Sequence, residues 1–266
     1  MPTEKKSRPV FVRDFQPGVV YLFQFPRMKC LPNLSPFCVK LECWLRFAKV
    51  QWKNVDDLPI SHRSVEGTLP KVEVNGVEYA DSAFVIAELP RILNVPSLED
   101  VLSEGERAVA LAFERLIENS LLLGTGKFRY ERLDQIIPLW PQTFGFAQPL
   151  FNAFFKRMLS SKLNGRLMGV GLGRHTREEI LKIVEDELNA CSVQLGTKPF
   201  LMGDSPTKVD ASLFAVLALI LYLPFDTEPK VHIVNKCPNL RDYADRIKAT
   251  YWPDWDEITN PKPKRT

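Results

Sequence analysis

The chain has 266 residues, about the length of two ordinary domains. Its apolar fraction of 45% and charged fraction of 25% are those of globular proteins, and they exclude a disordered or fibrous chain. The 35 Lys and Arg residues and the 32 Asp and Glu residues leave a net charge of +3, without a long run of either sign. Nucleic acid is therefore not an expected partner.

The 5 cysteines have neither CxxC nor Cys/His ligand spacing, which excludes a disulfide scaffold and a structural zinc site. We therefore expect a reducing, cytoplasmic location and no bound metal. No apolar segment follows the charged start of the chain, so residues 1–16 are expected to form a disordered, solvated leader. The longest apolar run, residues 211–223, is shorter than the roughly 20 residues of a membrane span and predicts a buried helix.

The first predicted elements are a strand, a helix and a second strand. Residues 18–25 are β-branched and aromatic without helical spacing, which predicts a buried strand. Apolar residues then recur with a helical period, and Ser35-Pro36 suits a helix start, so we expect a helix over residues 36–49. A second strand is expected over residues 50–55, followed by an irregular segment over residues 58–68.

A hairpin and a helix follow. Two short alternating runs, residues 71–74 and 77–80, flank Asn75-Gly76, the dipeptide that best supplies the two positive φ angles of a tight turn. Asp81 or Ser82 then caps a helix that ends near residue 93. The order of elements is thus βαβ followed by ββα, which is typical of a thioredoxin-like domain.

Beyond residues 94–103 the chain changes to long amphipathic helices. Two capping boxes, Ser103 with Glu106 and Thr176 with Glu179, begin helices that are expected to stop at Gly124 and Gly196. Two further helices are expected, over residues 211–223 after a cap at Thr207 and Asp210, and from residue 238 to about 247. We therefore predict an α/β plus all-α protein, with a thioredoxin-like domain over residues 17–94 and an all-helical domain over residues 103–258.

Four motifs in this order resemble those of cytosolic glutathione transferases, over roughly residues 19–255. They are SPFC at residues 35–38, TLP at 68–70, DS at 81–82 and PFLMGDSPTKVDASLFA at 199–215. The resemblance is greater to the subgroup of the failed axon connections protein and the cadmium-responsive nematode proteins, with the metaxins as more distant relatives. The segments that carry it are LSPFCVKLECWLR at 34–46, GVGLGRHTREEI at 169–180 and YWPDW at 251–255.

The resemblance implies a glutathione site in the first domain. Ser35 would donate a hydrogen bond to the glutathione sulfur, at a helix start that favours negative charge. The backbone of Leu69, before a cis Pro70, would pair with the cysteinyl backbone, and Asp81 with Ser82 would hold the γ-glutamyl end. The alternatives are that Ser35 and Asp81-Ser82 only cap helices and that Pro70 is an ordinary trans proline.

The aromatic residues Phe128, Tyr130 and Trp140 are candidates to line the pocket for an electrophile, and core packing is their alternative. Because Ser35 stands where a redox pair has its first cysteine, a two-cysteine cycle with Cys38 is unavailable. The glycines at 169–173 follow no strand and predict a tight connection between helices rather than a phosphate loop. The connection at residues 26–34 is longer than is usual in transferases and is expected to rearrange or cover the thiol site.

The expected function is that of a glutathione transferase-like protein, which adds the glutathione thiolate to a hydrophobic electrophile in detoxification or stress response. Glutathione is then a co-substrate, and a homodimer is implied by the same resemblance. The alternative is a non-catalytic protein that uses the fold as an interaction surface, because members of the failed axon connections subgroup are less firmly established as enzymes than ordinary transferases.

Overall fold

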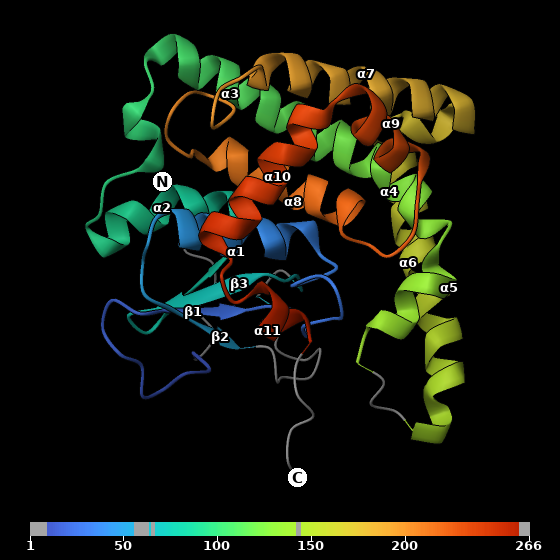
Figure 1. Ribbon diagram of the computed structural model, residues 1–266. Helices are drawn as coiled ribbons and strands as arrows, with labels where there is room; N and C mark the ends of the chain where they lie inside the picture. The colour runs from blue at the N-terminus through green and yellow to red at the C-terminus, as the bar shows by residue number, and fades with distance from the viewer. Residues whose placement is uncertain (1–9, 56–63, 65–66, 142–144, 261–266) are drawn as a thin grey trace.

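The computed structural model consists of a small sheet domain that lies against a larger helical domain (Figure 1). It describes residues 10–55, 64, 67–141 and 145–260. The sheet of the described residues contains β1 (Val20–Phe23), β2 (Trp52–Val55), β3 (Lys71–Val74) and β4 (Val77–Ala80), in the order β2-β1-β3-β4. β1 and β2 are parallel, and the other two pairs are antiparallel. The predicted thioredoxin-like order of elements is confirmed.

The strand register brings four strand ends into one row. Phe23 pairs with Val55 on one side and with Lys71 on the other, and Lys71 pairs with Ala80. We call this row the site end of the sheet, because β1, β2 and β4 end there and β3 begins there. The opposite end carries the predicted hairpin turn, in which Asn75 and Gly76 have φ angles of 51° and 77°.

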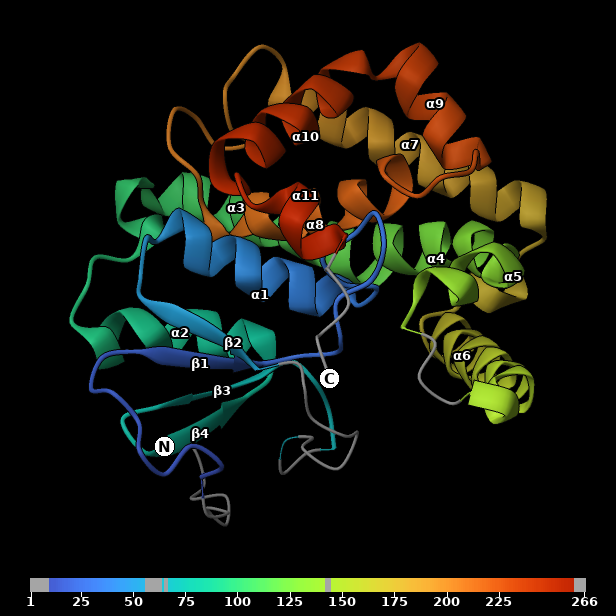
Figure 2. The same ribbon diagram turned by 60° about the horizontal axis from the view of Figure 1, so that its bottom comes forward.

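Two helices, α1 (Pro36–Phe47) and α2 (Ser82–Leu93), lie on the same face of the sheet, and α1 separates the sheet from the helical domain (Figure 2). α1 is buried on all sides, including its charged residues Lys40 and Glu42. A helix with no solvated face is expected where it packs on two layers at once. α1 is therefore the element that joins the two domains.

Residues 10–16 do not form the predicted solvated leader. The backbone N–H groups of Phe11 and Val12 donate to the carboxylate of Glu73 at 2.9 and 3.0 Å, and the Phe11 ring meets the Phe23 ring edge to face. Glu73 on β3 is itself buried, so its carboxylate needs such donors. This part of the chain therefore covers the sheet, while residues 1–9 lie outside the described residues.

The helical domain follows a short connection after α2. Its elements are α3 (Glu104–Leu116), a π-helical turn (Ile117–Leu121), α4 (Leu122–Tyr130), α5 (Leu133–Ile136), α6 (Gln148–Gly169), α7 (Arg177–Leu195), α8 (Lys208–Leu221), α9 (Glu228–Lys236), α10 (Pro238–Tyr251) and α11 (Trp255–Thr259). Both predicted capping boxes are present, at the starts of α3 and α7, and the predicted cap at Thr207 and Asp210 lies at the start of α8. Within the described residues, no helix combines the length and the apolarity that crossing a bilayer requires.

The buried carboxylate of Asp210 fixes the start of α8, the helix that packs on α1. It accepts hydrogen bonds from the backbone N–H groups of Leu201 and Thr207, at 2.7 and 2.8 Å, and from the Tyr243 hydroxyl at 2.9 Å. Burial raises the pKa of Asp210, and these donors oppose the rise. One side chain thus ties the loop before α8 and the helix α10 to the core.

The helix that begins at Ser103 does not stop at Gly124 as predicted. It continues through the π-helical turn and α4 to Tyr130. A methyl group at Gly124 would lie 2.5 Å from Cγ2 of Val184 on α7, so the glycine permits close contact between two helices. The helices α6, α9 and α11 were not predicted, whereas the glycines at 169–173 do form the predicted connection between α6 and α7.

Replacing Gly124 by Ala is expected to lower the free energy of unfolding by about 1–3 kcal/mol, because the overpacking against Val184 outweighs the better helix propensity of Ala. Gly165→Ala on α6 is the matched control, since no atom lies within 4 Å of the added methyl group. The control should gain up to about 1 kcal/mol. Denaturant titrations measure both, and a stabilised Gly124→Ala variant would refute the close contact.

Candidate functional site

Three segments with candidate residues meet at the site end of the sheet. Leu69 and Pro70 immediately precede Lys71 of β3, and Asp81 with Ser82 immediately follows Ala80 of β4. The chain that leaves β1 after Phe23 leads to Ser35 at the start of α1. The register therefore gathers segments that lie far apart in the sequence, as the resemblance implies.

Ser35 occupies the N-cap position of α1, but its hydroxyl caps nothing. Its side chain makes no capping hydrogen bond and contacts the thiol of Cys38 instead, while its backbone N–H donates to Oδ1 of Asn33 at 3.0 Å. The simple capping role is thus not what the structure shows. The hydroxyl lies at the positive end of the helix, where a bound thiolate is favoured electrostatically.

The bond between Leu69 and Pro70 is cis, as predicted. Among the described residues, the backbone N–H and C=O of Leu69 have no hydrogen-bond partner. A buried or half-buried amide in this state is available to an extended ligand that pairs with it as a strand does. Leu69 therefore presents the geometry that a peptide-like ligand requires.

Asp81 and Ser82 differ in what they do. Asp81 has a φ angle of 67°, and its carboxylate accepts from the N–H groups of Ala83 and Phe84 at 2.9 and 3.4 Å, so it caps α2. Ser82 is largely buried, and its hydroxyl forms no hydrogen bond within the described part of the chain. The N-terminus of α2 thus offers one uncommitted hydroxyl beside a helix start.

The long connection at residues 26–34 is part of the core between the domains. Met28 and Leu31 are fully buried, and the N–H of Lys29 donates to the C=O of Leu139 in the helical domain at 2.9 Å. Asn33 also holds the connection, because its Nδ2 donates to the C=O of Phe25 at 2.7 Å. The connection therefore closes the side of the site that faces the helical domain.

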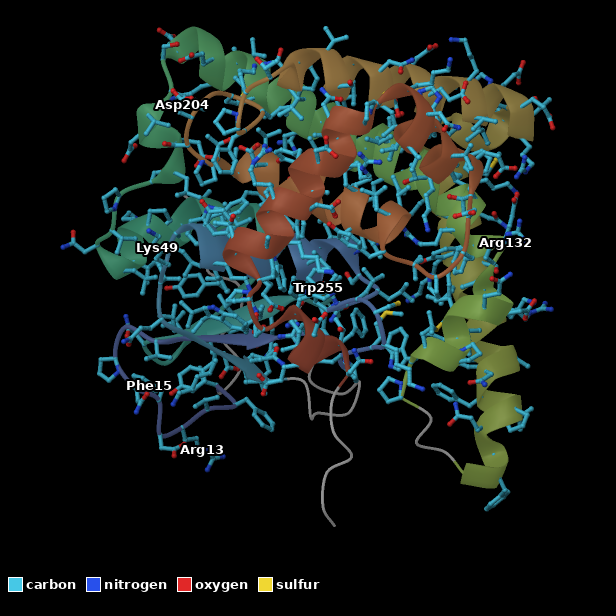
Figure 3. The ribbon with its side chains drawn as sticks, viewed as in Figure 1. Arg13, Phe15, Lys49, Arg132, Asp204 and Trp255 are labelled. Carbon is cyan, nitrogen blue, oxygen red and sulfur yellow. The ribbon has the colours of Figure 1, made fainter. Side chains whose placement is uncertain are left out.

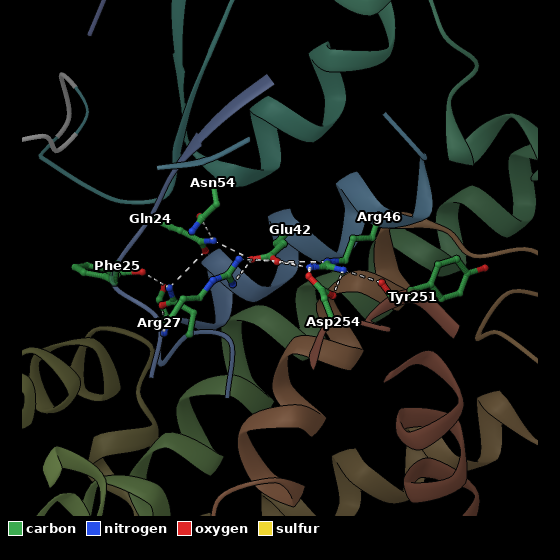
Figure 4. Close-up of polar contacts among 10 residues, drawn as sticks. Gln24, Phe25, Arg27, Glu42, Arg46, Asn54, Tyr251 and Asp254 are labelled. Carbon is green, nitrogen blue, oxygen red and sulfur yellow. Dashed lines mark hydrogen bonds and ion pairs between the residues drawn. The ribbon is translucent and has the colours of Figure 1, made fainter. Parts of the chain in front are cut away.

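A buried carboxylate, Glu42 on α1, anchors the same connection (Figure 4). It accepts two hydrogen bonds from Arg27 at 2.6 and 3.0 Å and one from Nε2 of Gln24 at 2.8 Å. The second cation, Arg46, reaches it at 2.9 Å from one turn further along α1. The charge of Glu42 is thus compensated from both sides, as a fully buried carboxylate requires.

Arg46 connects this network to the segment that follows α10. Its guanidinium donates to both carboxylate oxygens of Asp254, at 2.7 and 2.8 Å, and to the C=O of Tyr251 at 3.1 Å (Figure 4). It also lies 4.0 Å above the Trp252 ring. Trp255, which Figure 3 labels between the helical domain and the sheet, packs against Trp252 in turn. The YWPDW segment is therefore tied to α1.

A second buried network crosses the domain interface from Lys40. Its ammonium donates to Glu114 at 3.2 Å and to Glu118 in the π-helical turn at 2.5 Å, and Glu118 also accepts from the Ser212 hydroxyl at 2.7 Å. Burial alone would raise the pKa of Glu114, but the charges of Lys40 and Lys208 hold it below its usual value. A cavity of only about 10 Å³ remains beside this network and the first turn of α1.

The three aromatic candidates lie in different places. Trp140 meets the Phe25 ring edge to face at 6.1 Å, next to the connection, so it lies beside the site. Phe128 is almost fully buried beneath the guanidinium of Arg177, 4.8 Å away, which favours core packing. Tyr130 packs near Arg129 between the core and α6. The structure therefore brings only Trp140 close to the segments described above.

Comparison with known proteins places this geometry in a family. The family described as "Glutathione S-transferase N-terminal domain" matches residues 36–135, and "Glutathione S-transferase, C-terminal domain" matches residues 184–247. The isoprene-epoxide–glutathione S-transferase of Rhodococcus sp. is 30% identical over 83% of this chain and 94% of its own length. The chain belongs to the glutathione S-transferase family.

The failed axon connections protein of Drosophila melanogaster is 36% identical over 92% of this chain. The chain spans 61% of the length of that protein. Metaxin-2 of Mus musculus is more distant, at 24% identity over 81% of each chain. A glutathione S-transferase from Methylobacterium radiotolerans, solved with glutathione sulfonate, shares the fold with a TM-score of 0.57 at 16% identity, over 93% of this chain and 98% of its own.

The cysteines beside the site are expected to react slowly. Burial raises the pKa of Cys30 to about 11 and that of Cys38 to about 12, so their thiolate fractions at pH 7 are at least ~100-fold below that of a free thiol. In the time that a disulfide reagent needs to modify all 5 cysteines of the denatured protein, it should modify less than one cysteine per molecule of the native protein. Rapid reaction of the Cys38 thiol in the native protein would contradict its burial.

Asp254→Asn is expected to lower the melting temperature by about 2–4 °C at pH 7, the shift that about 1 kcal/mol produces in a domain of this size. Burial would raise the pKa of Asp254, but Arg46 lowers it below its usual value, so the carboxylate stabilises the fold above its unfolded pKa near 4. This stability is lost as the pH falls through the lower, folded pKa.

The difference between the wild type and the Asp254→Asn variant should therefore shrink as the pH falls below about 4, as measured by thermal melts from pH 7 downwards. Asp242→Asn, which breaks an exposed pair with Arg241, is the matched control and should change little at any pH. A difference that stays constant from pH 7 to pH 3 would show that the charge of Asp254 is not responsible.

Proposed function

We propose that the chain binds glutathione at the site end of the sheet and transfers its thiolate to a hydrophobic electrophile. The observation that carries the proposal is the Ser35 hydroxyl, which lies at the start of α1 without capping it. The uncommitted Ser82 hydroxyl and the unpaired backbone of Leu69 support it. So does the similarity to a relative that is named as an isoprene-epoxide–glutathione S-transferase.

The γ-glutamyl and cysteinyl parts of glutathione then each have a matching group. The γ-glutamyl carboxylate lies at the start of α2, where Ser82 donates its hydroxyl hydrogen. The cysteinyl N–H and C=O pair with the backbone of Leu69 as an added strand does. The sulfur then lies beside Ser35 at the start of α1, so the tripeptide spans the row of strand ends.

The chemistry that follows is addition of the sulfur to an electrophilic carbon. Ser35 turns its hydroxyl from Cys38 to the glutathione sulfur and lowers the pKa of that thiol by stabilising the thiolate. The thiol proton passes to water, and the thiolate forms the new carbon–sulfur bond as a halide leaves with its electron pair or as one carbon–oxygen bond of an epoxide breaks. The epoxide oxygen keeps that electron pair, stays on the neighbouring carbon and takes a proton from water. Ser35 remains protonated throughout. We assign this activity to the cytoplasm, to detoxification or stress response, and to a homodimer.

The packed connection at residues 26–34 favours a second candidate, a non-catalytic member of the family that uses the fold for binding. Met28 and Leu31 are fully buried in the connection that leads to Ser35, and the cavity beside the first turn of α1 is about 10 Å³, enough for one water molecule. An electrophile would need more room than this. The similarity to the failed axon connections protein is consistent with the second candidate.

Ser35→Ala is expected to lower turnover of glutathione with a chlorodinitrobenzene or an alkene epoxide by about 10- to 100-fold, the value of one hydrogen bond to a charged sulfur. Glutathione affinity, measured by calorimetry, should change little, and Ser35→Thr should restore turnover because it keeps the hydroxyl. Equal turnover of Ser35→Ala and the wild type would remove Ser35 from the mechanism.

Ser82→Ala separates binding from chemistry, because it should weaken glutathione affinity while the rate at saturating glutathione is kept. Affinity without turnover in the wild type would favour the second candidate. A wild-type protein that neither binds nor turns over glutathione refutes both the site and its chemistry.

A further inference from the structure

The start of α6 carries an exposed apolar ridge. Phe146, in the single turn that precedes α6 at Gly145–Ala147, is fully exposed, and Leu150 and Phe154 are 76% and 65% exposed. Their spacing of four residues places all three on one side of the helix. Large apolar side chains are usually exposed singly, so an ordered row of three marks an interaction surface.

The same stretch of chain has a strongly asymmetric charge. Between residues 135 and 177 there is no Asp or Glu, whereas 6 residues are Lys or Arg, in a chain that is nearly balanced overall. Lys156 pairs with Asp134, and Arg177 pairs with Glu131 and Glu228. The other four form no ion pair among the described residues, and they are exposed: Arg157, Lys162, Arg166 and Arg174. Their positive charge is therefore available to a partner.

The ridge stands on a part of the molecule that projects. In both views the start of α6 extends away from the body of the helical domain (Figure 1, Figure 2). The opposite side of this part of the helix holds it in place, because Phe155 packs edge to face on Trp140 at 5.1 Å and Phe151 stacks on Phe155. Aromatic contacts thus hold this part of α6 on one side, and its exposed apolar side chains lie on the other.

We propose that α6 docks the protein on an anionic membrane surface, with Phe146, Leu150 and Phe154 inserted at the level of the lipid headgroups. An apolar row combined with Lys and Arg, and without acidic residues, is the composition of helices that lie in the plane of such a surface. Arg157, three residues after Phe154, continues the ridge with a cation that reaches lipid phosphates while the aromatic ring is buried.

Two other occupants fit the observations less well. A second copy of the chain would bring the same unpaired cations against one another, which disfavours a self-complementary contact. A folded protein partner would need a groove that matches a convex ridge, whereas a fluid bilayer surface adapts to protruding side chains. The lipid surface is therefore the occupant that both the charge and the shape favour.

Sedimentation with vesicles tests the proposal. The full chain should bind vesicles of phosphatidylcholine with roughly 30% phosphatidylserine, and binding should fall steeply between about 0.05 and 0.5 M NaCl as the charges are screened. The double variant Leu150→Glu/Phe154→Glu should bind at least tenfold more weakly. Both side chains are exposed, so thermal melts of the variant should match those of the wild type.

Val193→Glu is the matched control, because it places the same charge on an 82% exposed apolar residue of α7 and should leave binding within twofold. Absence of wild-type binding, or equal loss in Val193→Glu, overturns the proposal. So does light scattering that shows a wild-type dimer and a monomeric double variant, since a second copy then covers the ridge. If the double variant melts early, Leu150→Ser/Phe154→Ser replaces it.

Discussion

The burial of α1 between the sheet and α8 is the constraint on which the rest of the structure depends. A helix with two packed faces has no solvated side for charges, yet α1 carries Lys40, Glu42 and Arg46. Each finds its partners in another part of the fold: Lys40 in α3 and the π-helical turn, Glu42 in the connection after β1, and Arg46 in the segment at the end of α10. Because an unpaired buried charge is strongly destabilising, the contacts of Lys40 and Arg46 make the docking of the two domains specific, while that of Glu42 holds the connection against α1.

The candidate site inherits its geometry from this arrangement. Ser35 is the residue before α1, so its position relative to Leu69 and Ser82 follows from the packing of α1 on the sheet. The register of β1, β3 and β4 then sets where the other two segments lie. A change at the domain interface, even far from Ser35, therefore acts on the site through the placement of α1 rather than through a direct contact.

Sequence patterns predicted what depends on neighbours in the chain. The capping boxes of α3 and α7, the cap of α8 and the Asn75-Gly76 turn are local, and all were found. The pair between Lys40 and Glu118 joins residues 78 positions apart and has no local signature.

Gly124 was misread because a glycine that ends a helix and one that permits close contact with a neighbouring helix look alike in sequence. α6 was missed because its apolar residues face two directions, which hides the helical period. In the candidate site, position along the chain and the family resemblance located Ser35, Leu69 and Ser82, and the length of the connection at residues 26–34 indicated that it would rearrange or cover the thiol site. The hydrogen bond from Lys29 to Leu139 that holds this connection has no local signature.

That connection decides which step of the proposed chemistry is the more demanding. Moving Met28 and Leu31 out of the core costs about 1.5–3 kcal/mol for each side chain, and the hydrogen bond from Lys29 to Leu139 is lost as well. A ligand that needed this opening would bind at least ~100-fold more weakly than one that did not. Glutathione in the proposed pose, along Leu69 and Ser82, would reach Ser35 without this opening. An electrophile that needed the space filled by Met28 and Leu31 would require it. In the proposed chemistry, glutathione binding is therefore the less demanding step, and conjugation is expected for electrophiles small enough to reach the sulfur with the connection in place.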